Sequence, residues 1–364
     1  MRSNDWRQIL PPEISKHVGK LAALPGYPRH LARFSNALRQ MKPKHLAAAQ
    51  VLAEQARRLA PDDVVVRQQT EWGFRKRVPR WHFNIINSAS RNEIYRTALR
   101  RHVRSGMVVF EVGTGTGVLA MLAAQAGAGH VYTCEREPLL VEVARENIAR
   151  NGLTDRITVI PKLSHDVRLG EDMPVRADLF VAELVDDGLL GEEALAITAD
   201  VQSRLLKPEA VLLPDLIELR GTLVGGPEWS RAFRAHPACG LDVSALDWLG
   251  PSVVQSPVCL EPHLAEDVTV LSFDLRAAAS YKTTQTTVQI TSREVGTADG
   301  FLHWIWLRFG VGLEYSNRPP SESCWTPQLH VFPRPLPVTL GQVVNLQVQH
   351  DCKRAHVGLE GALF

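Results

Sequence analysis

The chain has 364 residues, of which 45% are hydrophobic and 22% are charged, so it can bury the cores of two or three globular domains. It contains no run of about 18 apolar residues and its first residues lack an apolar signal core, which argues against a membrane span and favours the cytoplasm. Its five cysteines are far apart and form no C-x-x-C pair, so neither a metal site nor a disulfide framework is expected.

The formal net charge of +2 conceals an uneven distribution. Residues 1–106 hold 21 Lys and Arg against 7 Asp and Glu, whereas residues 107–364 hold 20 against 32. The basic charges are spread over helical residues with few aromatic residues between them, which is typical of solvated helix surfaces. Nucleic acid is therefore not expected as a partner.

Residues 1–65 are predicted to form a small helical domain. Apolar residues recur there at spacings of three, four and seven, and the prolines at 25, 28 and 43 interrupt the pattern. The last helix, which begins near His45, resembles the second helix of a tetratricopeptide repeat, although no full repeat period is visible.

Residues 66–214 alternate between apolar strands and helices, which is typical of a doubly wound α/β sheet. Strands are predicted at 107–112, 130–134, 156–160, 177–183 and 210–213. Helices are predicted at 118–125, 139–150 and 192–205.

Residues 215–364 are predicted to form a mostly antiparallel β domain, with an insertion at about 226–257. The strand patterns in this part lie at 218–224, 268–275, 286–291, 302–311, 328–332 and 343–348.

A glycine-rich motif, FEVGTGTGVL, joins the first strand of the α/β sheet to its helix and includes Glu111. Gly113, Gly115 and Gly117 permit a tight turn and the close approach of a ligand to the backbone. The spacing is G-x-G-x-G, not the G-x-G-x-x-G of dinucleotide enzymes. Glu135 ends the next strand, where a carboxylate can accept both hydroxyls of a ribose. Together these features favour S-adenosylmethionine over NAD as the cofactor.

Two polar residues follow the third strand of this sheet. Ser164 and His165 are placed to meet an adenine edge, although His165 can equally be a surface loop residue.

The fourth strand ends in an acidic loop, ELVDDGLLGEE, which begins at Glu183. Ligands of α/β sheets bind at this end of the strands. Glu183 and Glu192 are nine residues apart and can converge on one cation, although acidic loops are more often solvated.

This loop resembles the double-E hairpin of the protein arginine methyltransferases, in which two Glu side chains clamp the substrate guanidinium. The upstream segment VPRWHFNIINSASRN resembles the helix that caps the cofactor in that family. The resemblance implies that Arg91 holds the methionine carboxylate and that His82 also lies in the cofactor site. It further implies that Glu183 and Glu192 orient the guanidinium, with Glu192, or else the neighbouring Glu193, on the proton path.

The segment SESCWT takes the place of the family's T-H-W loop. The resemblance implies that Trp325 and Cys324 border the substrate pocket, while a core tryptophan of the β domain is the other interpretation of Trp325. Cys324 replaces the usual histidine, and Ser88 aligns with the acidic residue that normally pairs with it. Both partners are replaced together, so the resemblance still implies an enzyme but leaves its product specificity open.

The tetratricopeptide-like helix and the W-H-F segment are closest to the branch of the family numbered nine. The resemblance implies a homodimer formed through the insertion at 226–257 and S-adenosylmethionine as the cofactor, without a metal. We favour free L-arginine as the acceptor, as in streptozotocin-type biosynthesis, and keep arginine in proteins as the alternative. A non-catalytic arginine-binding scaffold is the hypothesis from another class, and a nicotinamide dehydrogenase ranks below it.

Overall fold

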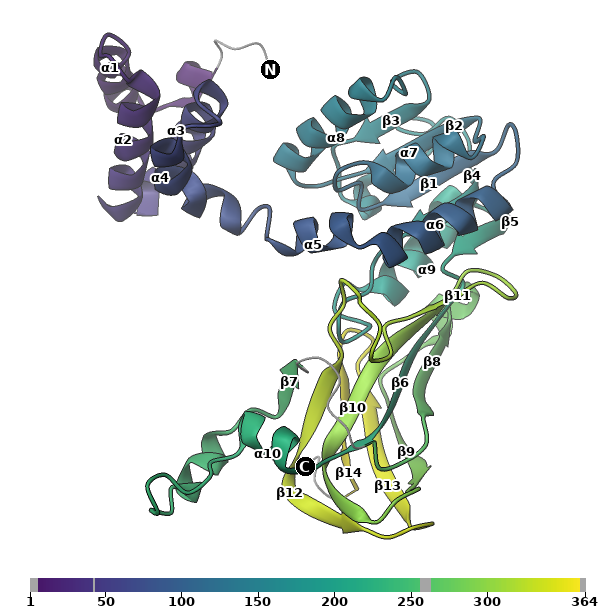
Figure 1. Ribbon diagram of the computed structural model, residues 1–364. Coiled ribbons are helices and arrows are strands. Elements are labelled where there is room, and N and C mark those ends of the chain that lie inside the picture. The colour runs from purple at the N-terminus through teal and green to yellow at the C-terminus, as the bar shows by residue number, and fades with distance from the viewer. Residues whose placement is uncertain (1–5, 42, 256–262, 361–364) are drawn as a thin grey trace. The chain divides into compact units, whose positions relative to one another are not determined.

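The computed structural model describes residues 6–41, 43–255 and 263–360. The chain divides into two compact units, Met1–His82 and Phe83–Phe364, and each is described by itself (Figure 1).

The first unit is helical, as the sequence predicted. Its elements are η1 (Trp6–Ile9), α1 (Pro12–Leu21), α2 (Tyr27–Met41), η2 (Pro43–His45), α3 (Leu46–Leu59) and α4 (Val64–Arg75). α2 packs against both α3 and α4 around a core that includes Leu31, Leu52 and Val66. The Asp63 side chain accepts hydrogen bonds from the backbone N–H groups of Val65 and Val66 and so begins α4. The predicted domain boundary at 65 falls inside α4, which packs within this unit, and the unit extends to His82. Helix α5 (Trp81–Asn87) follows.

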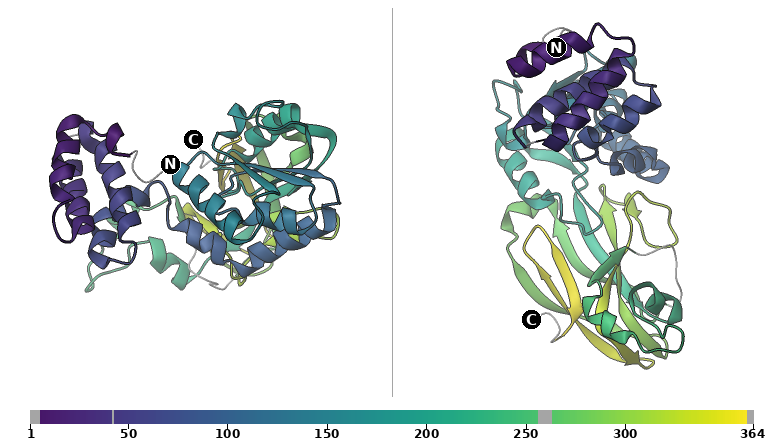
Figure 2. Two further views of the ribbon diagram at one scale, coloured as in Figure 1. Left: turned by 90° about the horizontal axis from the view of Figure 1, so that it is seen from above. Right: turned by 90° about the vertical axis from the view of Figure 1, so that its left-hand side faces the viewer.

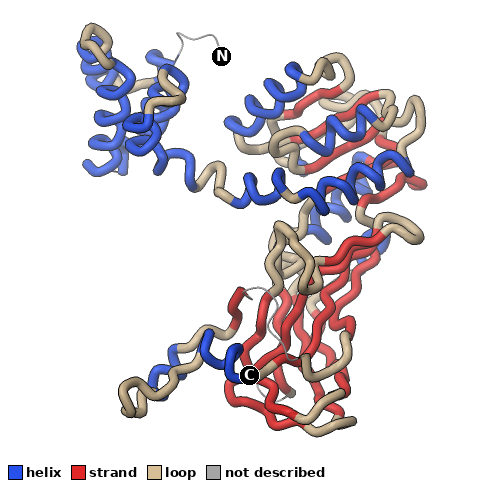
Figure 3. Tube along the Cα trace, viewed as in Figure 1, coloured by secondary structure: helices blue, strands red, loops and turns tan. Residues whose placement is uncertain are grey.

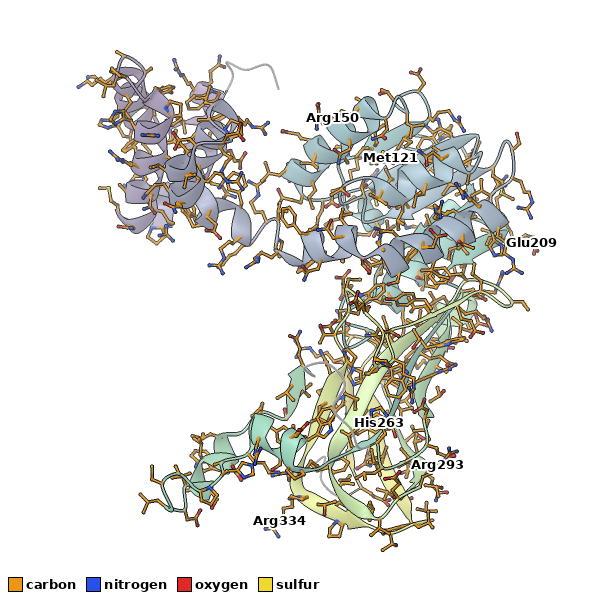
Figure 4. All side chains as sticks on the ribbon, in the orientation of Figure 1. Met121, Arg150, Glu209, His263, Arg293 and Arg334 are labelled. Atoms are coloured by element: carbon orange, nitrogen blue, oxygen red, sulfur yellow. The ribbon has the colours of Figure 1, made fainter. Side chains whose placement is uncertain are left out.

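The second unit contains a five-stranded parallel sheet, which confirms the predicted α/β fold. Its strands are β1 (Val108–Val112), β2 (His130–Cys134), β3 (Ile157–Ile160), β4 (Ala177–Ala182) and β5 (Leu206–Leu213). The helical elements are α6 (Ala89–His102), α7 (Val118–Gln125), α8 (Pro138–Arg150), η3 (Ser164–Asp166) and α9 (Ala194–Leu205). In Figure 4, Met121 marks α7 and Arg150 marks the end of α8.

The order of the parallel strands is β3-β2-β1-β4-β5. The chain turns from one side of β1 to the other after β3, so the edge beside β1 and β4 is the switch point where ligands of such sheets bind. The strands are nearly all buried because helices cover the sheet.

The second unit also contains two antiparallel sheets, as predicted (Figures 2 and 3). One has the order β7-β12-β10-β6-β8, with β11 added to β10, and the other has the order β14-β13-β9. The strands are β6 (Leu216–Val224), β7 (Val253–Gln255), β8 (Val268–Asp274), β9 (Thr284–Thr291), β10 (Gly296–Arg308), β11 (Glu314–Ser316), β12 (Gln328–Val338), β13 (Val343–His350) and β14 (Ala355–Leu359). A further 3-10 helix is η5 (Leu275–Ser280).

One hydrophobic core is continuous through the parallel and antiparallel parts of the second unit. It contains Phe110 of the parallel sheet as well as Ile217 and Phe301 of the antiparallel sheets. Asp215, at the junction, accepts hydrogen bonds from Arg308 Nη2 at 2.8 Å and from the backbone N–H of Gly310 at 2.9 Å. The two parts are therefore packed as one body.

The predicted insertion is an arm that projects from the antiparallel sheets (Figure 1). It contains α10 (Pro227–Phe233), η4 (Ser244–Leu249) and β7, which pairs with β12. The last two residues of the predicted insertion, 256 and 257, lie outside the described residues.

Within the described ranges, no helix has the length and apolar character needed to cross a membrane. Cys134, Cys239, Cys324 and Cys352 are free thiols, and Cys259 lies outside the described residues.

Gly221 of β6 provides a test of the packing between β6 and β10. A Cβ at this position would lie 2.3 Å from the carbonyl oxygen of Leu302 and 2.4 Å from the ring of Phe301. Gly221→Ala should therefore lower the free energy of unfolding by about 2–3 kcal/mol, measured by urea unfolding of the full chain with tryptophan fluorescence. Gly19→Ala is the matched control because its Cβ would meet nothing within 4 Å. An unchanged unfolding midpoint in Gly221→Ala would contradict the predicted packing.

Candidate active site

The carboxyl ends of β1, β2 and β4 lie side by side and bring three predicted residues together. Val112 at the end of β1 is in register with Cys134 of β2 and with Ala182 of β4. The next residues along these strands are Gly113, Glu135 and Glu183. The glycine turn and two of the predicted carboxylates therefore share one edge of the sheet.

The glycine turn after β1 needs glycine for its backbone conformation. Gly113, Gly115 and Gly117 have φ values of 83°, 52° and 88°, which side chains disfavour. A Cβ on Gly113 would meet nothing within 4 Å, so this face of the turn is open. A ligand can approach the backbone there.

Glu135 is held in place by backbone N–H groups. Its Oε2 accepts from Gly115 at 3.0 Å and its Oε1 accepts from Glu137 at 2.9 Å, and the residue is 8% exposed. Each carboxylate oxygen has further acceptor capacity, so both can still accept a hydroxyl. The carboxylate is thus oriented before any ribose binds.

Two buried polar atoms near this edge have no hydrogen-bond partner among the described residues, namely Arg91 Nε and Glu111 Oε2. Burial raises the pKa of Glu111 to about 8, while a hydrogen bond from Thr133 and the charge of Arg91 oppose the shift. An unpaired donor and an unpaired acceptor this deeply buried require a partner. The carboxylate and ammonium groups of a bound amino acid, such as the methionine part of S-adenosylmethionine, have the chemistry to satisfy them.

Three other predicted cofactor residues have different surroundings. Ser164 is buried in η3, and its carbonyl oxygen accepts from Arg204 Nη2 at 3.0 Å. The side chain of His165 is 65% exposed and lies 3.6 Å from Asp166, as a surface residue would. His82 lies on α5, where its ring stacks on Trp81 with centroids 3.8 Å apart. The roles of all three in binding stay predictions.

Glu183 forms a buried ion pair with Arg91. Arg91 Nη2 lies 3.3 Å from Glu183 Oε2, and the two side chains are only 5% and 10% exposed. Tyr95, one turn after Arg91 on α6, places its ring 4.9 Å from the guanidinium and donates to the carbonyl of Ala182 at 3.1 Å. Burial raises the pKa of Glu183, and the charge of Arg91 opposes that shift.

Glu192 faces the same region from the other end of the acidic loop. Burial raises the pKa of Glu192 to about 8, with further increases from the charges of Glu183 and Asp186 and opposition from Arg136. The effect of the Glu183 charge on the Glu192 pKa places the two carboxylates within Coulombic range of each other. Glu193, in contrast, is exposed and pairs with Lys353.

The loop between the two carboxylates, residues 183–192, is the carboxylate hairpin, and its own side chains shape it. Asp186 Oδ1 accepts from the backbone N–H of Gly191 at 3.0 Å. A Cβ on Gly191 would lie 2.0 Å from Asp186 Oδ2, so a larger residue there would have to displace the Asp186 side chain. Asp187 Oδ1 accepts from the N–H of Thr326 at 2.8 Å, and its Oδ2 accepts from Gln255 of the arm at 3.0 Å.

Trp325 and Cys324 lie under this hairpin. Trp325 is buried, packs edge-on against Tyr315, and donates from Nε1 to the carbonyl of Val185 at 2.9 Å. Burial raises the pKa of the Cys324 thiol to about 11, and a hydrogen bond with Ser88 opposes the shift. Ser88 and Cys324, which stand where the resemblance places the family's paired residues, are therefore close to each other.

Sequence reasoning missed Tyr95, Asp187, His303 and His330. The four-residue spacing of Arg91 and Tyr95 on one helix face is a signal that could have identified Tyr95. Asp187 is part of the acidic loop but was not singled out. The two histidines belong to separate strands and no local motif distinguishes them.

No group of His, Cys, Asp and Glu that could hold a metal ion is found in the described ranges.

The fold, together with the sheet edge that carries the glycine turn, defines the class of protein. The family model for ribosomal protein L11 methyltransferase (PrmA) matches residues 96–212, which contain the parallel sheet. The sheet and its glycine turn are therefore those of a methyltransferase.

Similarity to relatives over most of the chain defines the family. An arginine N(omega)-methyltransferase of Streptomyces achromogenes subsp. streptozoticus is 36% identical, with 75% of this chain and 77% of that protein covered. Protein arginine N-methyltransferase 9 of Xenopus laevis is 29% identical over 70% of this chain, which spans 35% of that protein. The chain belongs to the arginine N-methyltransferase family, and the predicted resemblance is confirmed.

Solved structures share the fold. The Trypanosoma brucei PRMT1 enzyme–prozyme heterotetrameric complex with AdoHcy has a TM-score of 0.67 at 21% identity, covering 78% of this chain and 94% of that chain. Arabidopsis thaliana protein arginine methyltransferase 10 has a TM-score of 0.61 at 20% identity, covering 73% and 86%. The combination of a parallel sheet with antiparallel sheets is thus the family architecture.

The raised pKa of Glu192 can be measured directly. In protein labelled with ¹³C at glutamate carboxyls, the resonance lost in Glu192→Gln should titrate near pH 8. Because the folded pKa exceeds the ordinary value of 4.5, unfolding stability should fall as pH rises from 4.5 to about 8, and Glu192→Gln should lack this component. A midpoint near 4.5 would contradict the described burial.

Proposed function

We propose that this protein transfers a methyl group from S-adenosylmethionine to a terminal guanidino nitrogen of L-arginine, giving Nω-monomethylarginine. The observation that carries the proposal is the buried Arg91–Glu183 ion pair at the strand end beside the glycine turn, with Glu192 close enough for the charge of Glu183 to raise its pKa. Family membership supports the reaction class.

The residues present fit S-adenosylmethionine, which supplies an electrophilic methyl group when bound. We assign the ribose to Glu135 and the methionine carboxylate and ammonium to the unpaired Arg91 Nε and Glu111 Oε2. The open face of Gly113 leaves room for the ligand against the backbone. Ser164 and His165 are our candidates for the adenine edge, and His82 is a further candidate for the cofactor site.

The two carboxylates offset the repulsion between a cationic substrate and a cationic cofactor. One carboxylate about 4 Å from a guanidinium contributes about 4 kcal/mol of attraction at an effective dielectric constant near 20. Removing a proton from arginine before the reaction would cost about 7 kcal/mol or more at neutral pH. We therefore propose that Glu183 and Glu192 orient a protonated guanidinium, which loses its proton late.

Glu183 and Glu192 have different environments and therefore different proposed roles. Arg91 stabilises the ionised form of Glu183, which suits it to orient the guanidinium. Among the residues that the structure describes, none forms such an ion pair with Glu192, and its pKa of about 8 suits it to accept a proton near neutral pH. Glu193 is engaged with Lys353 at the surface, which disfavours it as the alternative.

We favour free L-arginine as the acceptor because the relative that matches along most of both chains is named an arginine N(omega)-methyltransferase. Arginine in proteins is the alternative, and the match to protein arginine N-methyltransferase 9 supports it. An arginine-binding scaffold without activity is disfavoured by the presence of Gly113, Glu135, Glu183 and Glu192 at one edge. A cytoplasmic location stays a prediction.

Glu183→Gln keeps the shape of the side chain but removes the charge opposite Arg91. We expect kcat/KM for L-arginine to fall at least 100-fold, which corresponds to about 2.7 kcal/mol, with S-adenosylhomocysteine binding changed less than about threefold. The assay is methylarginine analysis after incubation with S-adenosylmethionine and either free L-arginine or an arginine peptide. Glu193→Gln is the matched control and should retain activity. Product formed only on the peptide would refute the free acceptor, and an active Glu183→Gln would refute the role of the hairpin.

We also propose that the arm forms a homodimer, because large apolar side chains are exposed on it. Trp248, Leu241 and Leu249 are 82%, 68% and 62% exposed. Large apolar side chains that are exposed on one projecting arm are typical of a protein interface.

Sedimentation velocity tests whether the arm forms a dimer. The unmodified protein should sediment as a dimer and Trp248→Asp as a monomer, because a buried charge would destabilise the interface. Val311→Asp, at an 86% exposed position outside the arm, is the control and should remain a dimer. A monomeric unmodified protein, or a dimeric Trp248→Asp, would contradict the proposal.

A further inference from the structure

Two buried histidines lie behind the carboxylate hairpin. His303 of β10 is 1% exposed and His330 of β12 is 5% exposed. His303 Nδ1 lies 2.8 Å from His330 Nε2, and His303 Nε2 lies 2.9 Å from the carbonyl oxygen of Asp187. The pair therefore connects the antiparallel sheet to the backbone of the hairpin.

The partners determine where the protons are. A carbonyl oxygen only accepts, so His303 Nε2 must carry a hydrogen and donate it to Asp187. In a neutral ring, Nδ1 of His303 is then the acceptor, and His330 Nε2 must be the donor. The hydrogen bonds accordingly point in one direction, from His330 through His303 to Asp187.

The surroundings of His303 and His330 keep both imidazole rings neutral. Burial lowers the pKa of His303 to about 4, against opposing effects of the Asp187 carbonyl and the charge of Asp186. Burial also lowers the pKa of His330, and the neighbouring His303 and His356 add to the shift. Both rings are uncharged near neutral pH, so the directed hydrogen bonds persist under assay conditions.

The Asp187 carbonyl, which accepts from His303, lies where the backbone of the hairpin has conformational freedom. Asp187 lies four residues after Glu183 and immediately before Gly188, in a loop that contains a second glycine at 191. Glycine-containing loops have many accessible backbone conformations. The side chain of Asp187 is held by Thr326 and Gln255, and the His303 bond fixes the peptide plane between Asp187 and Gly188.

We propose that His303 is a positioning residue for the reaction: it orients the carboxylate hairpin through the Asp187 carbonyl, and His330 fixes the tautomer that allows it to do so. The inference rests on the proposed function of the hairpin. Among the described residues, the His303 ring bonds to His330 and to the Asp187 carbonyl and not to Glu183 or Glu192, so its effect is exerted through the backbone.

Replacement of His303 by Asn or Gln tests the proposal. The Asn amide reaches the position of Nδ1 and leaves the Asp187 carbonyl without its donor, whereas the Gln amide reaches the position of Nε2 and can donate to it. We expect His303→Asn to lower kcat/KM for L-arginine about 10- to 100-fold, and His303→Gln to recover activity to within about threefold of the unmodified protein. The Kd for S-adenosylhomocysteine should change less than about threefold in both. His130→Asn, at the amino end of β2 away from the site, is the matched control.

Other outcomes would overturn the proposal. An unchanged kcat/KM in His303→Asn would do so, as would equal losses in the Asn and Gln variants or a parallel loss of S-adenosylhomocysteine binding. If His303→Asn does not fold, His330→Leu takes its place, since it keeps His303 but removes the donor that fixes the tautomer; full activity of a folded His330→Leu would then refute the proposal. Failure of the unmodified protein to methylate arginine would refute the proposed function instead.

Discussion

The buried ion pair between Arg91 and Glu183 is the interaction on which the rest of the site depends. A carboxylate that is only 10% exposed is costly to ionise unless a cation lies beside it. Arg91 supplies that cation from α6, and Tyr95 of the same helix packs under the guanidinium and contacts the strand that precedes Glu183. The helix, the strand end and the ion pair therefore form one structural unit.

This ion pair also gives the two carboxylates of the hairpin different electrostatic environments. The negative charge of Glu183 acts on Glu192, which lies farther along the loop, and adds to the effect of burial that raises the Glu192 pKa to about 8. A guanidinium entering between them would favour the ionised form of both. We propose that Arg91 partly takes the place of that guanidinium at Glu183, and that binding of an amino-acid carboxylate to Arg91 frees Glu183 for the substrate.

Much of the fold followed from periodicity in the sequence. β2 and α7 begin and end at the predicted residues, because their flanking turns contain glycine, whereas β10 extends six residues before its predicted start at 302. The three-residue strands β7 and β11 were missed because so short a segment has no detectable alternation. α9 begins at Ala194, two residues late, because Glu193 has a left-handed φ of 59°.

From the sequence, the site could be predicted only where a polar residue directly follows the end of a strand. Glu135 and Glu183 could be singled out because the carboxyl ends of parallel strands converge, and the register at Val112 places them at the same edge. His303 and Asp187 are separated by 116 residues, and only the tertiary fold pairs them. Trp325 could not be assigned to wall or core from its motif, and in the structure it is buried against Val185 and Tyr315.

The proposed site gives a physical reason for the uneven distribution of charge along the chain. The portion after residue 106 carries 32 acidic against 20 basic residues and contains every carboxylate of the proposed site. Both proposed ligands are cationic, and an acidic region attracts cations from solution.

A crystal structure of the protein with S-adenosylhomocysteine and L-arginine would decide whether the carboxylate hairpin binds the substrate guanidinium. The arginine guanidinium should lie between Glu183 and Glu192, with Arg91 bound to the carboxylate of the cofactor product. A guanidinium bound elsewhere, or one bound at the hairpin while the Arg91–Glu183 ion pair is unchanged and the cofactor carboxylate lies away from Arg91, would contradict it.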